Sequence, residues 1–327
     1  LPTVDGADPF QWLEEVDSKR ANTWVAQQNE KALARLTGDP RYPELLAQAR
    51  AIFTAQDRIA VPAFRAGGVD NLWQDADHPH GLWRHASRES YLAGTPDWRV
   101  LIDVDALGKA EGRNWFFHGA DCRKPDEAVC LVDLSDGGGD AVEIREFDTR
   151  TGAFVDGGFR LAEGKQSAAW LDADTLLVAR EWTPGEVTES GYAYVLKEMK
   201  RDGATRELFR GEPTDVSVSP IVLRGEGGKA EAVIARRGIT FYESDFMLLT
   251  PQGPQRIPLP KKAEYEAYVD GQVVFSLQEA FGDLPQGALV AFDLAALKAD
   301  PAAARAQLIF APGPRQAIQE AGFTDGK

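Results

Sequence analysis

The chain has 327 residues, of which 43% are hydrophobic and 27% charged, so its composition is that of a globular protein rather than a disordered one. Its 51 acidic and 36 basic residues give a formal net charge of −15, and no basic stripe is visible, which argues against a nucleic-acid partner. No apolar run approaches the roughly 18 residues that would span a bilayer. We expect a soluble protein without a membrane partner, located in either the cytoplasm or the periplasm.

The first segment, residues 1–58, has the apolar spacing of helices. Asp8-Pro9 supplies a cap and a first-turn proline for a first helix. Two more helices are predicted over residues 21–36 and about 43–55, with Gly38-Asp39-Pro40 between them. We therefore expect an N-terminal helical segment.

From about residue 59 the period changes from 3.6 to 2, with residues 59–62 as the first candidate strand, and a unit of about four strands then recurs. Asp-Gly and similar turns separate the strands, as antiparallel hairpins require. Each of five units ends in a short apolar strand: Trp98–Asp103, Phe154–Leu161, Arg206–Phe209, Gln255–Leu259 and Gln307–Ala311.

Four-stranded units that recur in this way are typical of a β-propeller. The fold is therefore predicted to be mainly β, with four-stranded antiparallel blades over residues 59–311. Residues 312–327 are predicted to be a polar tail that frays.

The two cysteines, Cys122 and Cys130, flank a short turn, so a hairpin disulfide is geometrically open to them. We expect two buried, reduced thiols instead, because so short a loop gains little from a crosslink. His78-Pro79-His80, near Asp75, Asp77 and His85, does not by itself bring three or four ligands together. No metal site and no cofactor are predicted.

Several phrases resemble the prolyl oligopeptidase (prolyl endopeptidase) family. They include DPFQWLEEVDSKRANTWVAQQN from Asp8, WLDADTLLVAREW from Trp170 and TESGY from Thr188. The stretches REFDTRTGAFVDGGFRLAEGK from Arg145 and DVSVS from Asp215 are similar to bacterial members. These matches are ordered along most of the chain.

The resemblance implies a seven-bladed propeller joined to an α/β-hydrolase domain, of which about five blades are present here. It also implies that the N-terminal helices lie beside the hydrolase domain. The propeller would cover the active site, admitting short proline-containing peptides and excluding large folded proteins. The ring would not be closed by a shared blade, which would let blades part.

The sequence departs from that family because no serine lies in a Gly-x-Ser-x-Gly nucleophile elbow. The family's catalytic Ser, Asp and His have no counterparts here, so no catalytic residue is predicted, and we expect the chain alone to be inactive. It looks like a fragment or a truncated homologue of a serine peptidase.

Arg180, Glu181 and Trp182 are the candidate substrate-gating residues, because they follow a buried strand and precede a long polar loop. They are predicted to face the central tunnel or the side where a hydrolase would dock. The alternative is that these three residues belong to a solvated loop with no role in gating.

Two other functions stay open: a stand-alone propeller that binds a protein partner, and a five-bladed glycosidase. The glycosidase needs opposed carboxylates, for which Asp75, Asp121, Glu181 and Asp215 are candidates. In the leading hypothesis the partners are short peptides and the hydrolase domain. Uncovered faces of the first and last blades also predict self-association.

Overall fold

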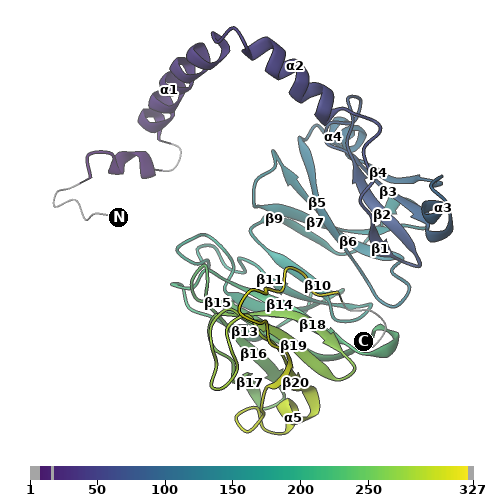
Figure 1. Cartoon of the computed structure of the whole chain (residues 1–327), viewed down its shortest axis with the longest axis vertical. Helices are drawn as coiled ribbons and strands as arrows, with labels where there is room; N and C mark the ends of the chain where they lie inside the picture. The colour runs from purple at the N-terminus through teal and green to yellow at the C-terminus, as the bar shows by residue number, and fades with distance from the viewer. Residues whose placement is uncertain (1–7, 16–17, 323–327) are drawn as a thin grey trace. The chain divides into compact units, whose positions relative to one another are not determined.

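The computed structural model describes residues 8–15 and 18–322 (Figure 1). The chain divides into two compact units. One contains the residues up to Ala60 together with 74–77, and the other contains 61–73 and the chain from His78 onward.

The first unit is helical. It contains a single 3-10 turn, η1 (Gln11–Glu14), and two helices, α1 (Lys19–Thr37) and α2 (Tyr42–Phe53). Ser18 caps α1, because its hydroxyl accepts a hydrogen bond from the Ala21 backbone N–H at 3.4 Å. Within these three elements Ala21 alone is buried, so their apolar side chains do not form a core. The exposed ones include Val25, Leu33, Leu36, Leu45, Leu46, Ile52 and Phe53.

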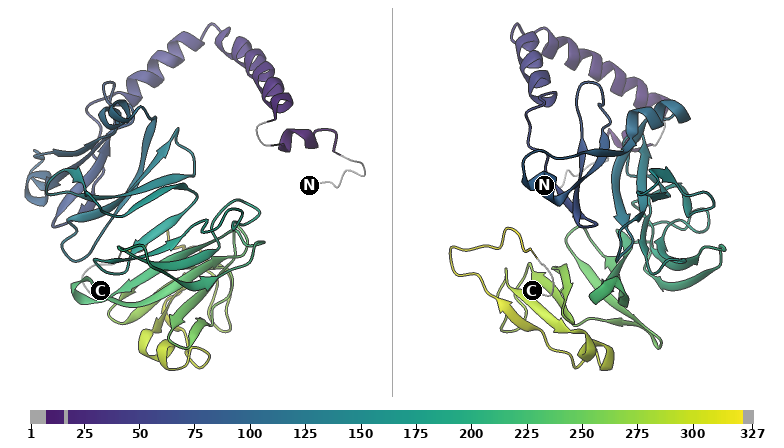
Figure 2. Two further views of the ribbon diagram at one scale, coloured as in Figure 1. Left: turned by 180° about the vertical axis from the view of Figure 1, so that it is seen from behind. Right: turned by 90° about the vertical axis from the view of Figure 1, so that its right-hand side faces the viewer.

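The second unit is a propeller of five antiparallel sheets in succession, as predicted (Figures 1 and 2). Blade 1 comprises β1 (Ala63–Arg65), β2 (Gly68–Trp73), β3 (Leu82–Ser87) and β4 (Arg99–Asp103). Blade 2 comprises β5 (Trp115–Cys122), β6 (Val129–Asp136), β7 (Val142–Asp148), β8 (Ala153–Phe154) and β9 (Arg160–Gly164).

The other three blades each have four strands. Blade 3 comprises β10 (Ser167–Trp170), β11 (Thr175–Ala179), β12 (Val195–Lys200) and β13 (Thr205–Arg210). Blade 4 comprises β14 (Ser217–Arg224), β15 (Ala230–Gly238), β16 (Ser244–Thr250) and β17 (Gly253–Arg256), with the 3-10 turn η2 (Glu226–Gly228) after β14. Blade 5 comprises β18 (Ala263–Val269), β19 (Gln272–Leu277), β20 (Leu289–Asp293) and β21 (Gln307–Phe310).

A middle strand of an inner blade can be buried on both faces, because its alternate side chains pack against different neighbours. In β11, Leu176 and Val178 belong to an apolar cluster shared with blade 2, whereas Leu177 and Ala179 belong to one shared with blade 4. Their complete burial explains why this strand is a continuous apolar run rather than an alternating one.

Two strands differ from the sequence prediction. The first strand is Ala63–Arg65 rather than residues 59–62, where Pro62 has no N–H for a ladder. The single strand expected over Phe154–Leu161 is split into β8 and β9, since the chain turns at Gly157 (φ 65°) and both pieces pair with β7.

Two helices were not predicted, α4 (Val104–Glu111) and α5 (Leu294–Ala299). Each begins after an aspartate whose carboxylate accepts a hydrogen bond from a first-turn backbone N–H. Asp103 accepts from Ala106 at 2.9 Å, and Asp293 accepts from Ala296 at 2.7 Å. Each of these aspartates is both the last residue of a strand and the N-cap of the helix that follows.

The expectation of reduced thiols is wrong, because Cys122 and Cys130 form a disulfide. The register of β5 against β6 places the two residues directly opposite each other, with their Cα atoms 3.9 Å apart. A short loop limits how much the crosslink can stabilise the fold, but cross-strand pairing holds the two sulfur atoms within bonding reach.

Residues 312–322 contain no helix or strand, yet part of this segment packs on the last blade. Ile318 contacts a cluster formed by Val274, Leu289 and Ala291 on the side of blade 5 away from blade 4. Over the described ranges, no helix is long and apolar enough to cross a membrane.

Phe275→Ala tests the packing between blades 4 and 5. Phe275 is fully buried, with ring centroids of Phe246 and Phe292 at 5.0 and 6.2 Å. Its truncation should lower the free energy of unfolding by about 3–5 kcal/mol, because a cavity is left in the apolar packing between the two blades. Urea unfolding measures this, with Phe241→Ala, at an 83% exposed position, as the control. Equal effects of the two substitutions would contradict the packing described.

Candidate functional site

The propeller has two faces that differ in the connections they carry. Since the strands of each blade alternate in direction, the loops between second and third strands lie at the end where the first strand begins, which we call the loop face. In blades 2–5 these loops are residues 137–141, 180–194, 239–243 and 278–288. The turns between first and second strands lie at the opposite end, which we call the turn face: residues 66–67, 123–128, 171–174, 225–229 and 270–271.

The predicted gating residues begin the β11–β12 loop on the loop face. Arg180 is half-buried, and no hydrogen bond or ion pair engages its guanidinium within residues 8–15 and 18–322. Glu181 is exposed, and its Oε1 accepts a hydrogen bond from the Gly185 backbone N–H at 2.6 Å. Of these two residues, Arg180 therefore has the charge that a ligand could engage.

Trp182 is fixed in place by the blade beneath it. Its indole N–H donates to the Val195 carbonyl at 3.1 Å, and the ring packs on the apolar cluster between blades 2 and 3. The Lys197 ammonium lies 4.9 Å from the ring centroid, within cation–π range. Trp182 therefore anchors the start of the β11–β12 loop to blade 3.

A polar cluster on the loop face joins blades 2 and 3 and was not predicted. The Tyr192 hydroxyl donates to Asp140 Oδ2 at 2.7 Å, and Lys165 Nζ lies 3.7 Å from the same oxygen. The hydrogen bond from Tyr192 lowers the pKa of Asp140, and this carboxylate in turn raises the pKa of Tyr192. Ser167, Ser217 and Ser219 line the adjacent cavity of about 140 Å³.

An aromatic pair lies on the loop between β15 and β16. Phe241 and Tyr242 are 83% and 73% exposed, with their ring centroids 5.0 Å apart in an edge-to-face arrangement. The loop beneath them is held by a hydrogen bond from the Ile239 N–H to the Glu243 carbonyl at 2.8 Å. Two large exposed rings on an ordered loop are typical of a contact surface.

Two carboxylates share the face of blade 2 that turns toward blade 3. Asp133 lies on β6 opposite Gly119 of β5, and Asp121 lies two residues further along β5. Burial raises the pKa of Asp133 to about 6, and the like charge of Asp121 adds to the shift. Partial desolvation also raises the pKa of Asp121, although its side chain is more open to water.

The histidines do not form a catalytic or metal centre with the residues described. His80 pairs with Asp105, with 2.5 Å between Nδ1 and Oδ1, and His85 pairs with Asp70, with 2.6 Å between the same atom types. His118 Nε2 lies 2.8 Å from the Ser135 hydroxyl, but Ser135 is fully buried and out of reach of a substrate. No group of three or more His, Cys, Asp or Glu that could hold a metal occurs within the described ranges.

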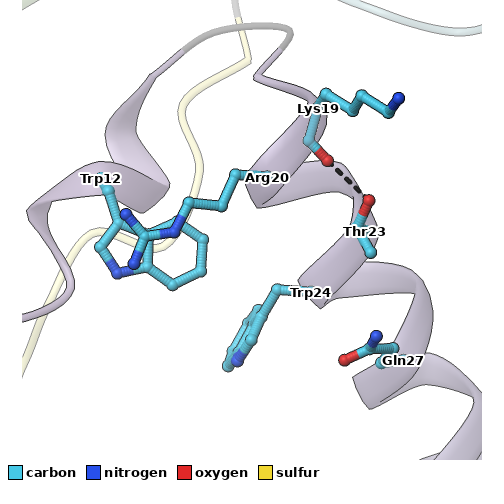
Figure 3. Close-up of a pocket in the computed structure, with 6 residues that line it drawn as sticks. All are labelled: Trp12, Lys19, Arg20, Thr23, Trp24 and Gln27. Carbon is cyan, nitrogen blue, oxygen red and sulfur yellow. Dashed lines mark hydrogen bonds between the residues drawn. The ribbon is translucent and has the colours of Figure 1, made fainter.

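The helical unit has a shallow pocket of about 640 Å³ (Figure 3). The rings of Trp12 and Trp24 meet edge to face with centroids 6.2 Å apart, and the Arg20 guanidinium lies 4.1 Å from the Trp12 ring centroid. These contacts pack η1 against α1.

Comparison with known proteins identifies the propeller. A family model described as prolyl oligopeptidase, N-terminal beta-propeller domain, matches residues 2–202. The chain belongs to the prolyl oligopeptidase family. The resemblance expected from the sequence is therefore confirmed.

Two curated peptidases are similar to this chain over nearly its whole length. An uncharacterized peptidase, y4nA, of Sinorhizobium fredii is 45% identical over 99% of the chain, which covers 46% of that protein. An uncharacterized peptidase of Rickettsia prowazekii is 27% identical over 96% of the chain and again 46% of its own length. The chain thus spans about half the length of the curated relatives it matches.

A solved structure agrees with the family assignment. The structure of a post-proline cleaving enzyme from Rickettsia typhi superposes with a TM-score of 0.83 at 25% identity, covering 93% of this chain and 47% of that one. These matches do not favour a stand-alone interaction module or a glycosidase. Among the glycosidase candidates, Asp215 is buried and its two oxygens accept hydrogen bonds from Arg237 at 2.7 and 3.0 Å.

Asp133→Asn should stabilise this propeller of the prolyl oligopeptidase family at neutral pH. The folded-state pKa of about 6 lies above the usual 3.8, so the folded state binds the proton more tightly and stability falls as pH rises from about 4 to 6. Asparagine carries no charge, so the free energy of unfolding should rise by about 1–2 kcal/mol at pH 7 and stay unchanged below pH 4.

Urea unfolding across this pH range measures the effect. Asp283→Asn, at an exposed position on the β19–β20 loop, is the matched control. The same gain at pH 4 and pH 7, or the same gain in the control, would contradict the assignment to Asp133.

Proposed function

We propose that this chain is the substrate-gating propeller of a serine peptidase that acts on short proline-containing peptides. The catalytic Ser, His and Asp would lie in an α/β-hydrolase domain, where acyl transfer takes place. The observation that supports this most is the match to a family propeller together with the likeness to a post-proline cleaving enzyme. The residues described here would admit or exclude the peptide.

The loop face is the surface that we expect to meet the hydrolase domain. β1 begins at this face, so the chain joins the propeller there. The same face carries the unengaged guanidinium of Arg180 and the exposed rings of Phe241 and Tyr242. A cation and an aromatic pair are suited to a peptide carboxylate and to an apolar domain surface respectively.

The helical unit supports the same arrangement. Its helices expose a row of large apolar side chains, including Leu33 at 59%, Ile52 at 68% and Phe53 at 73%. Many large exposed apolar side chains are typical of a docking surface, and helices without a core gain stability from a partner. We assign that partner as the hydrolase domain.

Arg180→Ala, introduced with this chain joined to its hydrolase domain, should raise KM for proline-containing peptides about 3- to 10-fold and leave kcat nearly unchanged. A lost contact of the free guanidinium with a peptide carboxylate explains this, because uniform binding affects KM alone. Arg150→Ala, at an exposed position in the β7–β8 turn of the turn face, is the control.

Steady-state kinetics with peptides of increasing length provides the measurement. The chain without the hydrolase domain should give no turnover that a serine reagent inhibits. An unchanged KM at every peptide length would refute the gating role of Arg180.

The outer sides of the first and last blades are a second expected contact surface. Phe64 and Val100 of blade 1 are 78% and 48% exposed, whereas Ile318 covers part of blade 5. We propose that this chain self-associates when nothing else covers these side chains. In sedimentation velocity the average mass should rise with concentration, and Phe64→Ser with Val100→Ser should reduce that rise. A monomer across the micromolar range would rule the association out.

A further inference from the structure

The turn 123–128 of blade 2 contacts three other blades at the turn face. Toward blade 1, the Glu127 carbonyl accepts a hydrogen bond from Arg65 Nη1 at 2.8 Å, and its carboxylate accepts one from the Ala66 N–H. Toward blade 3, the Arg123 guanidinium lies 5.4 Å from the ring centroid of Trp170. The third contact is with blade 4.

The contact with blade 4 is made by the loop 225–229. A Cβ atom built on Gly228 would overlap the Lys124 side chain and lie 3.2 Å from the Pro125 nitrogen. Glycine at 228 therefore lets two backbones meet that belong to blades 2 and 4. This contact spans the intervening blade, unlike the apolar clusters, which join consecutive blades.

Arg224 and Trp170 hold the two segments together. One guanidinium nitrogen of Arg224 donates to the Gly228 carbonyl at 2.9 Å, and the other donates to the Trp170 carbonyl. The Trp170 indole N–H donates to the Asp121 carbonyl of blade 2 at 3.0 Å. Trp170, which is 1% exposed, is thus bonded to blade 2 through its side chain and to blade 4 through its backbone.

Each of the two segments is also held by bonds within itself. The Cys122–Cys130 disulfide joins the strands at the base of the turn, and the Glu127 N–H donates to the Arg123 carbonyl at 2.9 Å. In the loop, the Gly225 N–H donates to the Lys229 carbonyl at 3.0 Å. Local bonds of this kind restrict each segment, which lowers the conformational entropy that their contact costs.

We propose that the turn 123–128 is a hub that holds blades 1–4 together as one sector at the turn face. To separate within this sector, two blades would have to break the hub contacts in addition to the apolar packing between them. If blades part to admit a peptide, they part outside the sector, between blades 4 and 5 or beyond blade 5. This last consequence rests on the proposed gating function, whereas the hub itself does not.

Gly228→Ala tests the hub, and Gly227→Ala is its matched control. The two glycines are adjacent, with φ of 77° and 72°, so an alanine is equally strained at both. A Cβ at 227 meets nothing within 4 Å, whereas one at 228 meets Lys124. Native-state hydrogen exchange of this chain should be about 10-fold faster in residues 123–128 and 225–229 for Gly228→Ala than for Gly227→Ala.

Two further variants keep the test decisive. Adding Lys124→Gly, which removes the colliding Cβ, should restore slow exchange to Gly228→Ala. Arg224→Lys keeps the charge but cannot bond two carbonyls with a planar fork, so it should accelerate exchange in both segments even if Gly228→Ala fails to fold. Equal exchange in Gly228→Ala and Gly227→Ala, or unprotected amides in both segments of the unmodified chain, would overturn the hub. No peptide is used, so failure here is separate from failure of the gating proposal.

Discussion

The structure depends on sheets that are apolar on both faces. In blade 2, Cys130, Val132 and Leu134 point to blade 1, while Val129 and Leu131 point to blade 3. Such a sheet cannot stand alone in water, because each face exposes apolar surface that costs about 25 cal/mol per Å². Stacking each blade between two neighbours is the arrangement that satisfies both faces.

This constraint leaves polar chemistry to the two ends of the propeller. Side chains in the middle of the strands pack between blades. Charges and hydrogen-bonding groups that contact other molecules are therefore expected on the loop face or the turn face. The Asp140–Tyr192 pair and the Arg224 guanidinium follow this rule, one at each face. Exceptions inside the stack include Glu143, Arg145 and Glu146 of β7, which are buried, and Asp133, whose pKa is raised by its burial.

Much of the fold could be predicted because its determinants are local. Buried runs such as Thr175–Ala179 and turns such as Arg201-Asp202-Gly203 gave the strands and their order. The α4 helix was missed because its cap, Asp103, also ends a strand. The disulfide depended on cross-strand register. Cross-blade pairs joined residues 52 and 54 positions apart, for which no local pattern exists.

The candidate site illustrates the same limit. The sequence placed Arg180, Glu181 and Trp182 at the end of a buried strand, yet only the coordinates separate a free guanidinium from an anchored indole. The apolar packing between consecutive blades is similar throughout the propeller, since the hydrophobic effect is non-directional. Directional contacts are what can make one seam harder to open than another, and here Arg224 and Trp170 concentrate them across blades 2–4. Blades with similar sheets can therefore still differ in how strongly they are held to their neighbours.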